Sequence, residues 1–308
     1  MKIFFSYAIS LMFGIVVFSQ SVPVPTSTPD MSSWVPPASR EKTKTPFSPK
    51  PFAGDNIFKG EAEKWLADAI IKVEIGSLTP IKDKEVSDYI SRIGMNLVSY
   101  SATPKKQFEF VVLDDDSQNA MNIGAGRVYI NLGMLKAVET EDELAGILAH
   151  EIGHDLFGHA PKTVTRQLFW MKGIRHIKTP AEAETALEKL MEAYEKNTLA
   201  LVGEALLGWS RANELEADKA AFYNIYKAGY NPEALKTTFR RFVKQEKEEN
   251  GENYSSNQFL TFLFGSHPPS SQRVTAQKWE SIWIKMPPKE SQYKNSAFDA
   301  MKARVAKM

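Results

Sequence analysis

Residues 140–154 read TEDELAGILAHEIGH, and this stretch decides the fold. Thr140 and Glu143 stand three residues apart, which is the spacing of a capping box at the start of a helix. The apolar residues that follow continue at helical spacing as far as the two histidines. The sequence therefore predicts a helix that begins after Thr140 and runs to about His159, where Pro161 ends it.

Two histidines lie on one face of this helix. His150 and His154 are four residues apart, so they are separated by about 40° around the helix and roughly 6 Å along it. Two imidazoles placed in this way can bind one metal ion at about 2.1 Å. Glu151 follows the first histidine, where its carboxylate can reach water at the metal but does not easily reach the metal itself. The H-E-x-x-H pattern thus predicts zinc ligands at His150 and His154, with Glu151 as the catalytic general base.

A catalytic zinc ion usually takes three protein ligands, and the chain has no cysteine that could provide one. His159 is one candidate, but on a continuing helix it points about 140° away from His154, which favours a place at the helix C-terminus. The other candidate is Glu214, which shares a predicted helix face with Asp218. We expect Glu214 to be the third ligand and Asp218 to bond the free imidazole N–H of a ligand histidine. Glu216 points about 200° from Glu214 and is expected to take no part.

The elements around the motif are mostly helical. Apolar spacing predicts helices at residues 61–75, about 86–97, 180–197, 198–228 and 233–247. Residues 108–113 and 127–131 have the composition of strands. Ala145, Ala149 and Gly153 form a row of small residues that allows a second helix to approach closely. The predicted fold is α+β and mostly α, zincin-like, with a small sheet and an H-E-x-x-H helix.

The charge balance and the absence of cysteine exclude several classes of function. Lys and Arg together number 38 and Asp and Glu number 37, a formal net charge of +1. Because no basic excess is present, we expect no nucleic-acid partner. The lack of cysteine excludes disulfide scaffolds, thiolate zinc sites and cysteine nucleophiles.

Several stretches carry a resemblance to one family. Residues 145–154 read AGILAHEIGH, and residues 210–218 read SRANELEAD. Together they resemble the M48 family of zinc peptidases, which pairs H-E-x-x-H with E-x-x-x-D on a later helix. Residues 119–135 (NAMNIGAGRVYINLGML) and 266–273 (SHPPSSQR) are similar to further family segments. The resemblance covers roughly residues 56–285.

The resemblance implies a zinc metalloendopeptidase of the soluble exported branch, with an Oma1-like peptidase domain and one zinc ion per chain. It also implies a periplasmic location and a role in quality control of unfolded, misfolded or misassembled envelope proteins. A zinc-binding chaperone or scaffold that holds such proteins without cutting them is the alternative. His267 lies in a turn fixed by two prolines and is expected to gate the zinc site or to assist catalysis, unless it is only structural.

We expect the second predicted strand to bind the substrate. Val128 and Ile130 point to one face of this strand, and Arg127, Tyr129 and Asn131 point to the other. An exposed strand edge can align an unfolded chain through main-chain hydrogen bonds. A strand that is fully paired within the sheet is the alternative.

The N-terminus has the pattern of an export signal. Lys2 supplies a positive charge, residues 3–18 form an uncharged run, and small and polar residues follow. The run is longer than in most signal peptides, so an uncleaved anchor, with membrane association through the N-terminus, is the alternative. Prolines are concentrated after this run, with 8 of the 17 in residues 21–54. The expected divisions are a signal peptide or anchor (1–20), a Pro-rich flexible linker (21–54), an M48-like peptidase domain (55–285) and a C-terminal extension (286–308).

Overall fold

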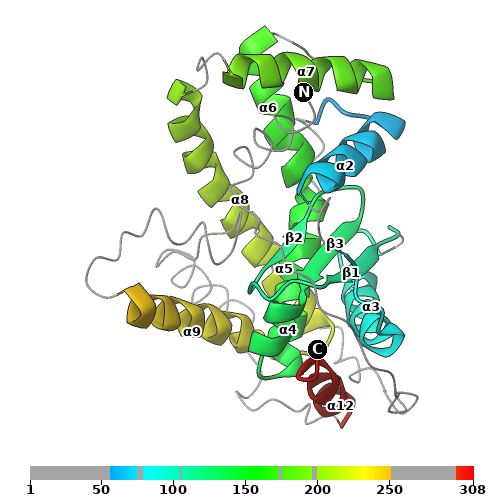
Figure 1. Cartoon of the computed structure of the whole chain (residues 1–308), viewed down its shortest axis with the longest axis vertical. Helices are drawn as coiled ribbons and strands as arrows, with labels where there is room; N and C mark the ends of the chain where they lie inside the picture. The colour runs from blue at the N-terminus through cyan, green and yellow to red at the C-terminus, as the bar shows by residue number, and fades with distance from the viewer. Residues whose placement is uncertain are drawn as a thin grey trace.

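The computed structural model describes most of the chain after the Pro-rich segment, namely residues 56–74, 79–104, 106–172, 174, 176–195, 200–250 and 296–308. Within these ranges the fold is mostly helical with one small sheet (Figure 1), so the predicted fold class is confirmed. The expected signal peptide, the linker and His267 lie outside the described residues. No helix within these ranges has both the length and the apolar character needed to cross a membrane.

Nine helices and three strands are described, in an order that places the sheet before the central helices. The helices are α2 (Glu61–Glu74), α3 (Lys84–Ser99), α4 (Leu132–Ala137), α5 (Glu141–Phe157), α6 (His159–Lys172), α7 (Pro180–Glu195), α8 (Ala200–Lys227), α9 (Glu233–Asn250) and α12 (Ser296–Val305). The strands are β1 (Glu109–Leu113), β2 (Ala120–Asn122) and β3 (Arg127–Asn131).

The sheet has the order β1-β3-β2, so β3 is its central strand. β1 pairs with β3 in parallel, from Glu109 opposite Arg127 to Leu113 opposite Asn131. β2 pairs with the other side of β3 in antiparallel, with Ala120 opposite Ile130. Because both edges of β3 are paired, the prediction that a substrate binds along Arg127–Asn131 is wrong. Among the described strands, β2 has one side without a neighbouring strand.

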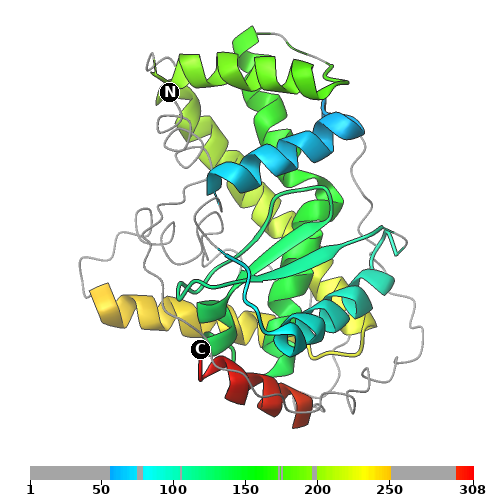
Figure 2. The same cartoon turned by 45° about the vertical axis from the view of Figure 1, so that its right-hand side comes forward.

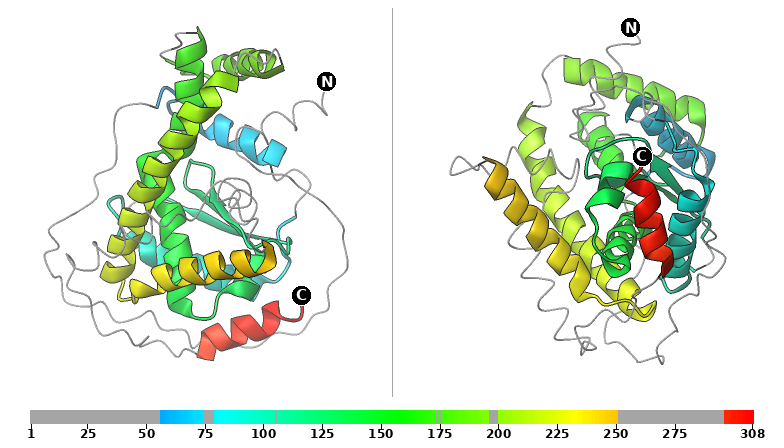
Figure 3. Two further views of the ribbon diagram at one scale, coloured as in Figure 1. Left: turned by 90° about the vertical axis from the view of Figure 1, so that its left-hand side faces the viewer. Right: turned by 60° about the horizontal axis from the view of Figure 1, so that its bottom comes forward.

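Helix α5 is the centre of the fold, and all 17 of its residues are buried. It packs along α8 and also contacts α3, α9, β2 and β3 (Figures 2 and 3). The row of small residues allows this packing: a Cβ added at Gly153 would lie 2.8 Å from the carbonyl oxygen of Ala217. Real Cβ atoms do not approach a backbone oxygen so closely. The close approach that the sequence predicts is therefore present.

The two ends of α5 differ in how well the sequence predicts them. At the start, the Thr140 side chain accepts a hydrogen bond from the backbone N–H of Glu143 at 3.2 Å, as an N-cap does. At the end, Gly158 has a left-handed conformation (φ 62°) and stops α5 at Phe157. The helix ends two residues before the predicted end near His159, and the prediction that Pro161 ends it is wrong. His159 begins α6 instead, and Pro161 lies in its first turn, where a missing N–H costs no helical hydrogen bond.

A second apolar cluster lies between the sheet and the helices α2, α6 and α7. It is separate from the main core around α5, and its larger buried members are Phe58, Leu66, Leu113, Tyr129, Val164, Leu168, Ile177 and Leu187. A bridge between Phe58 and Ile177 joins the segment before α2 to the segment before α7. This cluster packs α2, α6 and α7 against the sheet.

The last helix, α12, packs into the main core. Phe298 and Met301 are buried there. The Lys302 ammonium donates to three carbonyl oxygens at the end of α4, at 2.7–3.0 Å. Arg304 pairs at 2.8 Å with Asp83, the residue that caps α3. The described part of the C-terminal segment thus fastens α3 and α4 to each other.

The contact at Gly153 gives a first prediction. Gly153→Ala should lower the free energy of unfolding by about 1–3 kcal/mol, because the added methyl group meets backbone that cannot rotate away. Gly146→Ala is the matched control, since its Cβ would lie 3.1 Å from the Cβ of Leu235, a contact that a shift of a few tenths of an ångström relieves. Urea unfolding of both variants measures the difference. Equal stability of the two would contradict the tight contact between α5 and α8.

Candidate metal centre

Three side chains from α5 and α8 converge in the buried interior. The Nε2 atoms of His150 and His154 lie 3.0 Å apart. Glu214 places one carboxylate oxygen 3.4 Å from the Nε2 atom of His150 and the other 3.4 Å from that of His154. All three residues are at most 5% exposed, and their candidate ligand atoms lie within 4.8 Å of one another.

This donor set fits a metal ion. Two imidazole nitrogens and one carboxylate are the ligands of one class of catalytic zinc site, which keeps a further position for water. Bonds of about 2.1 Å in a tetrahedron put neighbouring ligand atoms roughly 3.4 Å apart. The separations between His150, His154 and Glu214 are 3.0 and 3.4 Å. The spacing therefore matches one ion shared by all three residues.

Two further predicted residues lie beside this cluster. Glu151 is 2% exposed and follows His150 directly on α5. Asp218 is also buried, and its Oδ1 atom lies 3.0 Å from Nδ1 of His150. Asp218 thus faces the nitrogen of His150 that points away from Glu214, which is where the helical spacing places it. Such a contact fixes the tautomer and the orientation of a ligand histidine.

His159 and Glu216, which the sequence does not favour as ligands, form a pair beside His154. His159 is 4% exposed, and its Nδ1 atom lies 2.8 Å from Nδ1 of His154. Its Nε2 atom lies 3.2 Å from a carboxylate oxygen of Glu216. Burial lowers the pKa of His159, and the hydrogen bond from His159 lowers the pKa of Glu216. The expectation that His159 points away from His154 is wrong, because Gly158 turns the chain back before α6. Glu216 contacts His159 and is not among the converging candidate ligands.

The residue after His154 connects α5 to the sheet. Asp155 is buried and accepts a hydrogen bond from the backbone N–H of Gly126 at 2.8 Å. The Asn122 side chain donates to the same oxygen at 3.4 Å, and Lys106 forms an ion pair with the other oxygen. Asp155 therefore ties the turn between β2 and β3 to the helix that carries the histidines. No sequence motif marks this residue.

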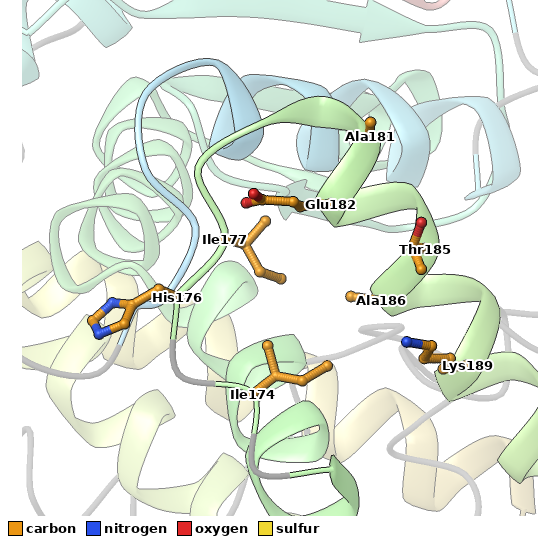
Figure 4. Close-up of a pocket in the computed structure, with 8 residues that line it drawn as sticks. All are labelled: Ile174, His176, Ile177, Ala181, Glu182, Thr185, Ala186 and Lys189. Carbon is orange, nitrogen blue, oxygen red and sulfur yellow. The ribbon is translucent and has the colours of Figure 1, made fainter.

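A separate cavity of about 390 Å³ lies at the start of α7 and is lined by none of the converging residues (Figure 4). Ile174, Ile177 and Ala186 give it apolar walls, and His176 stands at its rim. His176 is exposed, as the sequence suggests from its basic neighbours. The cavity is therefore not part of the candidate metal centre.

The arrangement of α5 and α8 defines the class of the protein. A helix with the H-E-x-x-H pattern and a carboxylate from a second helix matches a zincin-like metallopeptidase site. Residues 84–280 match the profile of peptidase family M48, a match that covers more than half of the chain. The chain belongs to peptidase family M48, and the resemblance stated from the sequence is confirmed.

The chain is similar to named proteases from bacteria and mitochondria. It is 26% identical over 201 residues to the β-barrel assembly-enhancing protease of Escherichia coli (strain K12), which covers 63% of this chain and 40% of that protein. It is 26% identical over 186 residues to the mitochondrial metalloendopeptidase OMA1 of Schizosaccharomyces pombe, which covers 60% of this chain and 50% of the relative. The chain spans about two fifths to one half of the length of these relatives.

The geometry predicts a graded loss of metal. Glu214→Ala should release the metal at concentrations that saturate the wild type, because it removes one of three ligands. Asp218→Ala should weaken binding about 10- to 100-fold, the range for a residue that orients a ligand histidine. Titration against a chromogenic chelator measures both, with His176→Ala as the control. A larger loss for Asp218→Ala than for Glu214→Ala would contradict the assignment of the ligand.

Proposed function

We propose that this M48 peptidase is a zinc-dependent endopeptidase that hydrolyses unfolded or misassembled envelope proteins in the periplasm. The observation that carries the proposal is the convergence of His150, His154 and Glu214 on one point between α5 and α8. The signal-like N-terminus supports export. The similarity to a bacterial protease named for β-barrel assembly supports a role in the envelope.

The proposed chemistry divides three roles among five buried residues. His150, His154 and Glu214 hold one zinc ion, which when bound acts as a Lewis acid and lowers the pKa of water to about 7. Glu151 takes the proton of the attacking water and delivers it to the leaving amine of the peptide. Asp218 holds His150 in the tautomer that leaves its Nε2 lone pair directed at the cluster.

We further propose that the substrate pairs with β2. Asn119 and Ile123, on either side of β2, both bond to β3, through Asn131 and Arg127. Because hydrogen-bonding direction alternates along an antiparallel strand, the main-chain groups of Ala120 point away from β3. Asp155 fixes the turn that follows β2 against α5, one residue from His154. An extended peptide added to β2 would therefore run beside the ligand-bearing helix.

The role of Glu151 gives the decisive test. Glu151→Gln should keep about one zinc ion per chain and lose cleavage of casein by at least about 100-fold, the lower range for a general base. Elemental analysis measures the zinc, and peptide release measures cleavage, with and without a chelator. The His176→Ala variant is the control and should cleave at the wild-type rate. Zinc-loaded wild type that binds unfolded protein but never cleaves it would replace the proposal with a chaperone or scaffold.

The role of β2 is tested by removing one outward N–H group. Ala120→Pro should raise KM for an unfolded substrate about tenfold with little change in zinc content, because the lost group is worth about one hydrogen bond. Ala120→Gly is the matched control, since it keeps the N–H and should leave KM near the wild-type value. An unchanged KM for Ala120→Pro, with the protein still folded, would rule out β2 as the substrate strand.

A further inference from the structure

The two ring nitrogens of His154 face different partners. Its Nε2 atom is directed at the candidate metal cluster, 3.0 Å from His150 Nε2 and 3.4 Å from Glu214. Its Nδ1 atom lies 2.8 Å from Nδ1 of His159, and Nε2 of His159 lies 3.2 Å from Glu216. The Glu216 side chain is 52% exposed, whereas the two histidines are buried. A continuous chain of polar contacts thus runs from the cluster to the surface.

The chemistry of these groups gives the hydrogen bonds between them one direction of donation, from His154 toward Glu216. A histidine that binds a metal through Nε2 uses the lone pair of that atom, so the ring proton of His154 must lie on Nδ1. Only one proton fits between two Nδ1 atoms, and Nδ1 of His159 is therefore the acceptor. The proton of His159 then lies on Nε2, which faces a carboxylate that can only accept. Each contact from His154 to Glu216 has one donor and one acceptor.

The fold holds His159 in place for this contact. Gly158 makes the left-handed turn that ends α5, so His159 begins a new helix and its ring returns toward His154. The His159 ring stacks on Phe157, with centroids 5.6 Å apart and planes 15° apart. It meets the His154 ring edge to face at a centroid distance of 4.8 Å. The position of the ring is therefore set by packing as well as by hydrogen bonds.

We propose that His159 and Glu216 are a positioning pair that orients His154 toward the metal, and this inference rests on the proposed metallopeptidase function. The pair does for His154 what Asp218 does for His150. The difference is that Asp218 reaches its histidine directly at 3.0 Å, whereas Glu216 acts through a second imidazole.

The proposal makes α8 the source of three separate contributions. Glu214 supplies the third ligand, Asp218 orients His150, and Glu216 orients His154 through His159. The three carboxylates lie within five consecutive residues of one helix. A shift of α8 would therefore weaken all three contributions together, so that metal binding reports on the contact between α5 and α8.

The test compares removal of each member of the pair with a conservative replacement. His159→Ala and Glu216→Ala should each weaken zinc binding about 10- to 100-fold and change the visible absorption of the cobalt-substituted protein. His159→Gln should recover part of the affinity, because its side-chain oxygen can accept the proton of His154. Glu216→Gln should lie between wild type and Glu216→Ala, since it keeps an acceptor and loses the charge.

Matched controls separate this proposal from a general loss of packing. His176→Ala and Glu184→Ala remove an exposed histidine and an exposed glutamate that are not among the candidate ligands, and both variants should bind zinc as the wild type does. Wild-type affinity and cobalt absorption in both His159→Ala and Glu216→Ala would overturn the positioning pair while the proposed function stands. Failure of His159→Gln to recover any affinity would also overturn it, in favour of packing alone. A wild-type chain that binds no zinc would instead refute the proposed function.

Discussion

The close contact between α5 and α8 is the constraint on which the rest of the structure depends. The candidate ligands come from both helices, and metal–ligand distances tolerate errors of only about 0.2 Å. At Gly153 the two helices are so near that a Cβ would lie 2.8 Å from the Ala217 carbonyl oxygen. Ala217 follows Glu214 by three residues, so the same contact brings that carboxylate within 3.4 Å of both histidines. Because residue 153, between the two histidines, is a glycine, α5 and α8 approach closely enough for their ligands to share one metal ion.

A central helix with no exposed residue must provide a partner for each of its charges. At the start of α5, Glu141 accepts hydrogen bonds from Tyr89 at 2.5 Å and from Tyr230 at 3.2 Å. Burial, together with the charge of Glu141, raises the pKa of both tyrosines, which keeps them as donors. At the other end Asp155 bonds Gly126 in the turn between β2 and β3. These hydrogen bonds hold both ends of α5. They therefore fix the position of the two histidines relative to the sheet.

Helical periodicity predicts the candidate metal site because the residues of each pair lie on one helix. His150 and His154 lie on α5, Glu214 and Asp218 lie on α8, and four-residue spacing fixes their common direction in any surroundings. Composition predicts the strands β1 and β3, but β2 and its pairing with β3 could not be predicted in the same way. β2 has only three residues, and the turn that pairs it with β3 includes Ala125 at φ 53°, a conformation that residues other than glycine rarely adopt. Pairing of this kind depends on contacts such as the one to Asp155, which no local pattern contains.

The wrong direction predicted for His159 has a clear physical origin. Helical phase relates residues only along a single axis, and the left-handed Gly158 ends the axis of α5 one residue before His159. From there the direction of the His159 ring depends on where α6 packs, which is a tertiary property. The phase of α8 does separate Glu216 from Glu214, but a side chain from a third helix reaches Glu216 on its own face. A site of this kind is therefore built from three helices, and only two of them carry the spacing by which it can be recognised. The third is marked by a glycine in the position of a helix C-cap, after which a residue can turn back toward the ligands.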